Sequence, residues 1–312
     1  MMKAVLQYRA SPRLRRQIFA LDVPTAIVDE TDRDGFLREI RDADILLHVL
    51  EPVTAEIIGA APRLRLIQKI GIGVNTIDLE AAGRRAIAVC NMPGTNTQAV
   101  AELTLLLMLA TLRRLAELDH LTRAGNGWNF DPALPDDLGE LSSRIVGLVG
   151  FGAVARRLVP MLQAIGANVV YTSRRKAADA PIPFVPIREL LPIVDVLSLH
   201  VPLVPETAGM IDAKALAAMK RGGILINTAR GPLVDEAALL EALRSGHLRG
   251  AGLDVFCREP AAADDPLLRL PNVVVTPHLA WLTAETLQRS LSVIAENCRR
   301  LATGEPLLHR VV

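Results

Sequence analysis

The chain has 312 residues, half of them apolar, so it is long enough for two domains and can bury a large core. Lysine and arginine, 35 in all, nearly balance the 34 aspartates and glutamates, which excludes a global field that would gather nucleic acid or an acidic membrane surface. The most apolar run, 103–112, has about ten residues and is too short to span a bilayer, so we expect a buried helix there.

Cysteine usage and the N-terminal residues favour a cytoplasmic protein. Cys90, Cys257 and Cys298 lie far apart and have neither the spacing of a metal site nor that of a disulfide framework. The first residues lack the apolar core of a signal peptide. We therefore expect no bound metal, and neither a nucleic acid nor a membrane as a partner.

The first third of the chain alternates short apolar strands with helices. The strands are predicted at 3–8, 25–29, 44–49, 64–70 and 87–90, and the helices near 12–20, 32–42, 54–60 and 78–85. Such continuous apolar strands, separated by helices, indicate a parallel sheet covered on both faces. One long helix is then predicted from about Thr97 to Arg123, followed by a loop rich in Gly, Pro and Asp.

A second alternating series begins after this loop. Its strands are predicted within 144–151, 167–172, 194–201, 222–229, 250–256 and 272–278, and a final helix runs from about Thr283 to Thr303. Two such series joined by one long helix predict an α/β protein with two doubly wound parallel-sheet domains.

A glycine-rich turn follows the first strand of the second series. In GLVGFGAVARRL, Gly150 permits a tight turn, Gly152 lets backbone approach a pyrophosphate, and Ala155 lets helix and strand pack closely. The N–H groups at the helix start, which includes Ala153 and Val154, favour phosphates. An ordinary strand–helix turn with incidental glycines is the alternative. The order of strand, turn and helix favours a dinucleotide site.

The end of the next strand predicts which dinucleotide is preferred. Thr172 stands where an acidic residue would accept hydrogen bonds from the adenosine ribose, and Ser173, Arg174, Arg175 and Lys176 follow it. Without a carboxylate a 2′-phosphate is not repelled, and an arginine can bind it as a bidentate partner. The sequence therefore predicts that NADP is preferred, with NAD still usable. A solvated basic loop is the alternative.

Three polar residues follow strands of the second series. Arg230 and Glu259 come just after the predicted strands of 222–229 and 250–256, and His278 ends the stretch 272–278, directly after VVVTP. The carboxyl ends of parallel strands face one crevice, where a guanidinium binds a carboxylate, an imidazole transfers a proton, and a carboxylate fixes the tautomer of that imidazole. Taken singly, each has a structural explanation: a salt bridge, a turn and a strand-end hydrogen bond.

Around these residues, the sequence resembles the D-isomer-specific 2-hydroxyacid dehydrogenases, and in particular the short glyoxylate and hydroxypyruvate reductases. The stretches that carry the resemblance are KIGIGVNTID, VCNMPGTNTQAVAELTLLLML, GLVGFGAVARRL, DVLSLHVPLVPETAGMI, ILINTARGPLVDEAALLEAL, AGLDVFCREP and TPHLAW. The resemblance implies that Arg230 holds the substrate carboxylate, that Glu259 pairs with His278, and that His278 is the acid–base residue. It also implies cofactor contacts for Pro202, Thr207, Thr228, Ala229 and Asp254, and substrate contacts for Ile72 and Gly73.

The resemblance further implies a Rossmann cofactor domain, 98–284, inserted into a flavodoxin-like substrate domain of residues 1–97 and 285–312. It implies a homodimer formed through the cofactor domains. Trp281 stands where many members have Gly or Ser, so we expect its ring to narrow the substrate pocket or, alternatively, to cap the helix that follows. Trp128 could reach the site of a partner subunit.

The expected activity is reduction of a small 2-oxo acid, of glyoxylate or hydroxypyruvate type, to the D-2-hydroxy acid by NADPH. Two alternatives stay open. One is oxidation of 3-phosphoglycerate, with Lys69 meeting the phosphate. The other is a cofactor-sensing binding module without turnover.

Overall fold

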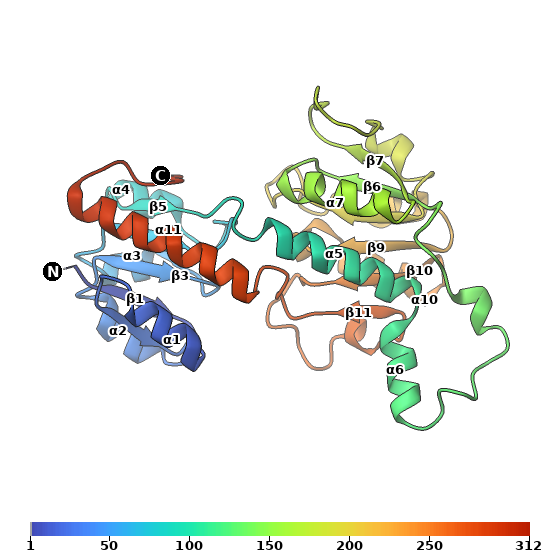
Figure 1. The fold of residues 1–312 in the computed structure, drawn as a ribbon, viewed down its shortest axis with the longest axis horizontal. Helices are drawn as coiled ribbons and strands as arrows, with labels where there is room; N and C mark the ends of the chain where they lie inside the picture. Colours follow the sequence, from blue (N-terminus) through green and yellow to red (C-terminus); the bar gives the residue numbers. More distant parts are fainter. Residues whose placement is uncertain (1) are drawn as a thin grey trace. The chain divides into compact units, whose positions relative to one another are not determined.

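The computed structural model describes residues 2–312 and divides into two compact units (Figure 1). Unit 1 comprises residues 2–96 together with 282–312, and unit 2 comprises Thr97–Trp281. Unit 1 is therefore built from both ends of the chain, and unit 2 is inserted in the sequence between them. The sequence predicts domain boundaries after residues 97 and 284.

Unit 1 has a five-stranded parallel sheet. Its strands have the order β2-β1-β3-β4-β5, which is the flavodoxin-like order. Their bounds are β1 Ala4–Gln7, β2 Thr25–Val28, β3 Ile45–His48, β4 Leu66–Lys69 and β5 Ala88–Cys90. The helices of this unit are α1 Pro12–Phe19, α2 Arg33–Ile40, α3 Ala55–Ala60, α4 Leu79–Arg84 and α11 Ala284–Thr303. After α11 the chain returns to β5, where the Val311 amide donates to the Val89 carbonyl at 2.7 Å.

Short polar side chains start the helices of unit 1. Ser11, Asp32, Thr54 and Asp78 each precede a helix and accept a hydrogen bond from a backbone N–H of its first turn. Such caps satisfy amides that have no partner within the helix, which is why each helix begins where the sequence predicted it to within a residue or two.

Unit 2 has a six-stranded parallel sheet in the order β11-β10-β9-β8-β6-β7. The strands are β6 Ile145–Val149, β7 Asn168–Thr172, β8 Val196–Leu199, β9 Gly223–Asn227, β10 Leu248–Leu253 and β11 Val273–Val275. On the side of β7 away from β6, Tyr171 forms an isolated parallel bridge with Phe184. If this bridge is counted as an abbreviated third strand, the strands follow the order of the Rossmann fold with β11 added at the edge.

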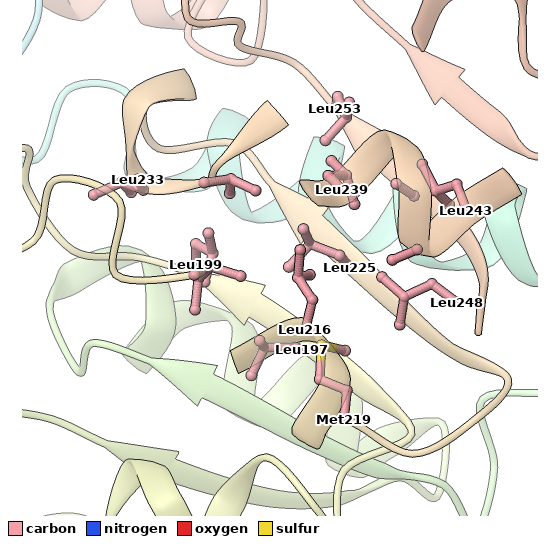
Figure 2. Close-up of a cluster of buried hydrophobic side chains, with 14 of the residues drawn as sticks. Leu197, Leu199, Leu216, Met219, Leu225, Leu233, Leu239, Leu243, Leu248 and Leu253 are labelled. Carbon is pink, nitrogen blue, oxygen red and sulfur yellow. The ribbon is translucent and has the colours of Figure 1, made fainter. Parts of the chain in front are cut away.

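Helices cover both faces of this sheet, as its apolar strands predict. On one face α5 (Thr97–Leu112) and α7 (Ala153–Ala164) pack over residues such as Val146 and Leu148. On the other, α8 (Ile187–Leu190), α9 (Ala213–Ala218) and α10 (Glu236–Arg244) pack over a second apolar core. Figure 2 shows that this second core is built mainly from leucines, which fits the scarcity of aromatic residues: Leu197, Leu199, Leu216, Leu225, Leu233, Leu239, Leu243, Leu248 and Leu253.

The prediction of a single long helix from Thr97 to Arg123 is wrong. The chain forms α5 and a separate helix, α6 (Leu115–Arg123), because Arg114 adopts a left-handed backbone with φ 49°. Its guanidinium makes ion pairs with Glu117 at 2.8 Å and Asp137 at 3.2 Å, which stabilise the break. The apolar run within α5 is mostly buried, although Leu106 is 53% exposed.

Three short 3₁₀ segments complete unit 2: η1 Leu134–Asp137, η2 Gly231–Leu233 and η3 Pro266–Arg269. Across residues 2–312, no helix has both the length and the apolar character that a bilayer crossing requires.

Candidate active site

The glycine-rich turn joins β6 to α7. Gly150 has φ +100°, and a Cβ on it would lie 2.5 Å from the carbonyl oxygen of His200 at the end of β8, so only glycine fits. Gly152 begins α7, and a Cβ on it would meet no atom within 4 Å. Packing within the described chain therefore does not require glycine at 152. Gly152 is the N-cap of α7, and this helix start is exposed and has no side-chain cap, which favours an anion.

The loop after β7 is fixed by contacts with this turn. The Phe151 ring stacks on Tyr171 with 4.2 Å between centroids, and the Arg156 guanidinium lies over Phe151. Arg156 also makes two hydrogen bonds, of 2.8 and 2.9 Å, to the carboxylate of Asp179 in the loop. The Tyr171 hydroxyl accepts from the Ala177 amide at 2.9 Å. The protein's own contacts therefore define the shape of this loop.

Three cations lie at the beginning of that loop. Arg174, Arg175 and Lys176 are exposed, and within residues 2–312 none of them forms an ion pair. The Ser173 hydroxyl donates to the carbonyl of Arg175 at 2.6 Å, which folds the turn that presents them. The loop thus carries unneutralised positive charge directly after β7.

The turn after β8 contains the next two expected cofactor residues. The Thr207 hydroxyl donates to the Pro202 carbonyl at 2.7 Å and accepts from the Val204 amide at 2.9 Å. Thr207 therefore closes this turn, and Pro202 lies at its start beyond the carboxyl end of β8.

Arg230 lies in a turn that is shaped by Asn227, a residue that sequence reasoning missed. The Asn227 carboxamide donates to the Arg230 carbonyl at 2.8 Å and accepts from the Ala229 amide at 3.0 Å. An Asn at a strand end often hydrogen-bonds to the backbone two residues later and so forms a turn. The stretch NTAR could therefore have predicted this turn. Burial lowers the pKa of Arg230 below its ordinary value, and the charge of Glu259 opposes this effect. The guanidinium stays charged at neutral pH.

Thr228 is oriented inward. It is buried, and its hydroxyl lies 2.9 Å from that of Thr104 in α5. Because Thr104 donates its own proton to the Val100 carbonyl at 2.7 Å, Thr228 must be the donor between the two. The Thr228 hydroxyl proton is thus used inside unit 2.

Gly231 brings the Arg230 turn against the loop that carries Glu259. A Cβ on Gly231 would overlap the backbone of Phe256 and Cys257, so no other residue fits without movement. The Phe256 amide donates to Glu259 Oε1 at 3.0 Å. The charges of Arg230 and Glu259 therefore interact. Glu259 acts to raise the pKa of Arg230, and Arg230 acts to lower the pKa of Glu259.

His278 and Glu259 form a direct pair. His278 Nδ1 lies 2.6 Å from Glu259 Oε2. A carboxylate accepts hydrogen bonds, so Nδ1 carries the proton and Nε2 is the atom that can exchange one with a ligand. Burial acts to raise the pKa of Glu259, but hydrogen bonds from His278 and Phe256 outweigh it, and the pKa is lowered.

Asp254 holds the loop that positions His278. Its side chain is fully buried, and its two oxygens accept from the Thr276 hydroxyl at 2.6 Å and the Leu279 and Ala280 amides at 2.9 Å. Its carbonyl accepts from the His278 amide at 2.7 Å. His278 has φ 54°, a backbone that non-glycine residues rarely adopt. Burial raises the pKa of Asp254. Both carboxylate oxygens are thus occupied by this loop, a role that the sequence did not indicate.

Glu259→Gln tests the charge of the pair. Because the folded pKa of Glu259 is lowered, its stabilising contribution is present above the ordinary pKa of a glutamate and is lost as the pH falls through the folded value. At neutral pH the free energy of unfolding should be higher for the wild-type protein than for Glu259→Gln. This difference should become smaller as the pH is lowered. Urea unfolding over a pH series measures it. Glu189→Gln, an exposed site outside any ion pair of the described chain, is the control. A difference that is constant with pH would contradict the prediction.

The other residues expected from the sequence lie in unit 1 or elsewhere in unit 2. Ile72 and Gly73 follow β4 in unit 1, and within residues 2–312 their N–H groups donate to no acceptor, an arrangement that suits an anion. Trp281 ends unit 2 and is 8% exposed, whereas Trp128 is 82% exposed. Among the residues that the structure describes, no cluster of His, Cys, Asp or Glu could hold a metal ion.

The fold and the site together define a class. Unit 2 is a Rossmann-type domain whose strands end, at one edge of the sheet, in a glycine-rich turn, an arginine and a hydrogen-bonded His–Glu pair. Residues 105–280 match the family model described as "D-isomer specific 2-hydroxyacid dehydrogenase, NAD binding domain". The chain belongs to the D-isomer-specific 2-hydroxyacid dehydrogenase family, as the sequence motifs indicated.

Relatives within the family carry several activities in their names. A D-3-phosphoglycerate dehydrogenase of Mycobacterium leprae is 41% identical over 283 residues, which cover 89% of this chain and 53% of that protein. The chain thus spans about half the length of the mycobacterial relatives that it matches. A glyoxylate reductase of Thermofilum pendens is 40% identical over 281 residues, covering 88% of this chain and 82% of that protein.

A solved structure has the same fold with ligands bound. The NADPH-dependent glyoxylate/hydroxypyruvate reductase of Sinorhizobium meliloti, in complex with NADP and malonate, superimposes with a TM-score of 0.85. It is 27% identical, and the match covers 100% of this chain and 97% of that one.

Proposed function

We propose that this protein is an NADPH-preferring oxidoreductase that reduces a small 2-oxo acid to the D-2-hydroxy acid. The observation that carries the proposal is the His278–Glu259 pair beside Arg230, at the same edge of the unit 2 sheet as the Gly150 turn. An acid–base group, a carboxylate-binding cation and a dinucleotide turn are what reduction of a 2-oxo acid requires.

In the proposed mechanism the chain supplies binding and the proton. Arg230 binds the carboxylate of the substrate through two hydrogen bonds and polarises the neighbouring ketone. His278, held through Nδ1 by Glu259, gives the proton on Nε2 to the ketone oxygen. When bound, the nicotinamide supplies the hydride that forms the new C–H bond at C2. Glu259 stabilises the protonated imidazole before the transfer.

The preference for NADPH is supported by the basic loop. Arg174 and Arg175 follow a strand that ends in Thr172 rather than in a carboxylate, and hydrogen bonds within the loop hold its shape. We expect one of these guanidiniums to bind the adenosine 2′-phosphate. A solvated loop without this role would leave NADH and NADPH equally good.

The cofactor test uses a double variant. Arg174→Gln with Arg175→Gln should lower the ratio of kcat/KM for NADPH to that for NADH by about ten- to a hundredfold, since one hydrogen bond to a charged group contributes about 1.5–3 kcal/mol. Initial rates with both cofactors measure it. Arg188→Gln, another exposed arginine of unit 2, should leave the ratio unchanged. A wild-type preference for NADH would refute the proposal.

A small, unphosphorylated substrate is favoured over 3-phosphoglycerate. Lys69, the cation expected to meet a phosphate, is only 7% exposed, and its ammonium donates to the Val49 carbonyl. Glyoxylate and hydroxypyruvate are therefore the first substrates to assay, in a panel of 2-oxo acids with NADH and NADPH. A cofactor-sensing module would bind NADPH and oxidise it with none of them.

The remaining parts of the proposal concern the two units and assembly. Unit 2 binds the dinucleotide, and in unit 1 the N–H groups of Ile72 and Gly73 bind a carboxylate. A homodimer is supported by the exposed apolar side chains of Leu106, Leu115, Trp128 and Phe130, which lie in α5, in α6 and in the loop that follows α6.

A further inference from the structure

Two arginines come together at the amino ends of the unit 2 strands, on the side of the sheet opposite to the Gly150 turn. Arg144 precedes β6, and Arg249 is the second residue of β10, so both lie where these parallel strands begin. Both side chains reach Gly139. The point that a Cβ on Gly139 would occupy lies 2.6 Å from Arg144 Nη2 and 3.3 Å from Arg249 Nη1. The two guanidinium groups therefore converge on Gly139.

The protein itself does not neutralise this pair. Within residues 2–312 neither Arg144 nor Arg249 makes an ion pair. Arg114 is a third cation whose charge acts on Arg249. Among the described residues, Asp137 is the acidic group whose charge acts on Arg249, and it also forms an ion pair of 3.2 Å with Arg114. Burial and the charge of Arg144 lower the pKa of Arg249, which reflects two like charges held in proximity.

The protein's own hydrogen bonds satisfy only part of these guanidiniums. Arg144 Nε donates to the Glu140 carbonyl at 2.6 Å, and Arg249 Nη2 reaches the Leu112 carbonyl at the end of α5 at 3.4 Å. Arg249 Nε is buried and has no partner. Capping of the α5 C-terminus explains one nitrogen of Arg249 but leaves Nε and Nη1 unexplained. The described chain thus supplies no hydrogen-bond acceptor for these two nitrogens.

We propose that Arg144 and Arg249 form a binding site for a small oxyanion, separate from the dinucleotide site. The ligand chemistry is that of a phosphate or a carboxylate, because planar guanidinium groups bind both through paired hydrogen bonds. The anion is either a free phosphate or a carboxylate side chain of a second copy of this chain. The site lies at the amino ends of the strands, whereas the Gly150 turn lies beyond a carboxyl end, so both can be filled together.

The test measures unfolding temperature in phosphate and in chloride at matched ionic strength. Phosphate should raise the unfolding temperature of the wild-type protein, and half-saturation should require at least about tenfold more phosphate in Arg144→Gln and in Arg249→Gln, since each loses a charge-assisted hydrogen bond. Arg221→Gln, which removes an exposed unpaired charge of unit 2, should behave as wild type. The increase should persist in saturating NADP, because the sites are at opposite edges.

Sedimentation of the same proteins without phosphate separates the two sources. If phosphate has no effect but Arg144→Gln and Arg249→Gln both shift the monomer–dimer equilibrium, the bound group is a carboxylate of a second copy. The proposal fails if neither phosphate response nor assembly depends on the two arginines, or if NADP abolishes the phosphate response. Two separate variants guard against misfolding of one of them.

Discussion

Replacing His278 with alanine should lower kcat/KM for reduction of a 2-oxo acid by about 10²–10⁴-fold, the usual contribution of a positioned general acid. In the structure Nδ1 of His278 is held by Glu259 at 2.6 Å, which leaves Nε2 to deliver the proton. The loss should appear mainly in kcat, because the proton moves only in the transition state. Initial rates of NADPH oxidation with glyoxylate and hydroxypyruvate measure it.

A second histidine of the same unit provides the control for this variant. His247 is also half-buried, and its Nε2 hydrogen-bonds the Leu216 carbonyl at 3.0 Å. His247→Ala should cost some stability but leave turnover near normal. Binding of NADPH, followed by fluorescence, should be retained in His278→Ala. Near-normal turnover of that variant on every active 2-oxo acid would remove His278 from the mechanism.

The architecture could be predicted from the sequence because its signals are local and repeat along the chain. Apolar strands alternating with helices allow few arrangements, since parallel strands need crossover helices on both faces. Caps such as Asp32 and Asp78 lie within three residues of the amides that they satisfy. The strand order itself is not local, and it came from the family resemblance.

The break between α5 and α6 could not be predicted in the same way. Nothing near Arg114 in the sequence is a strong helix breaker, and apolar residues continue on both sides. The left-handed conformation of Arg114 is stabilised partly by Asp137, which is distant in sequence and reaches it only in the folded unit. Tertiary contacts of this kind override helix propensity.

The candidate site shows the same division between residue type and contact. Arg230, Glu259 and His278 could be singled out as candidates because each comes at or after the end of a strand and has chemistry of its own. The residues that hold them were missed or given another role, since Asn227, Asp254 and Gly231 act through hydrogen bonds and close packing. For example, Asp254 binds the loop of His278 through residues more than twenty positions away.

Arg230→Lys should raise KM for the 2-oxo acid and lower kcat/KM by about 10²-fold or more, although the charge is kept. A lysine ammonium is a compact charge on a flexible chain and cannot make the paired hydrogen bonds of a guanidinium. Each hydrogen bond to a charged group contributes about 1.5–3 kcal/mol. Arg230 is also partly buried and donates to the Ala229 carbonyl at 2.6 Å, so its side chain is held in place before the substrate binds.

The neighbouring loop supplies a matched control for this change. Arg258 precedes Glu259, is exposed, and makes no ion pair within the described residues, so Arg258→Lys should retain wild-type kinetics. The NADPH dissociation constant should be unchanged in Arg230→Lys, because we assign its guanidinium to the substrate. If KM for the 2-oxo acid stays the same while NADPH binding weakens, Arg230 acts on the cofactor instead. If the wild-type protein turns over no 2-oxo acid, the proposed activity itself is wrong, whatever Arg230 binds.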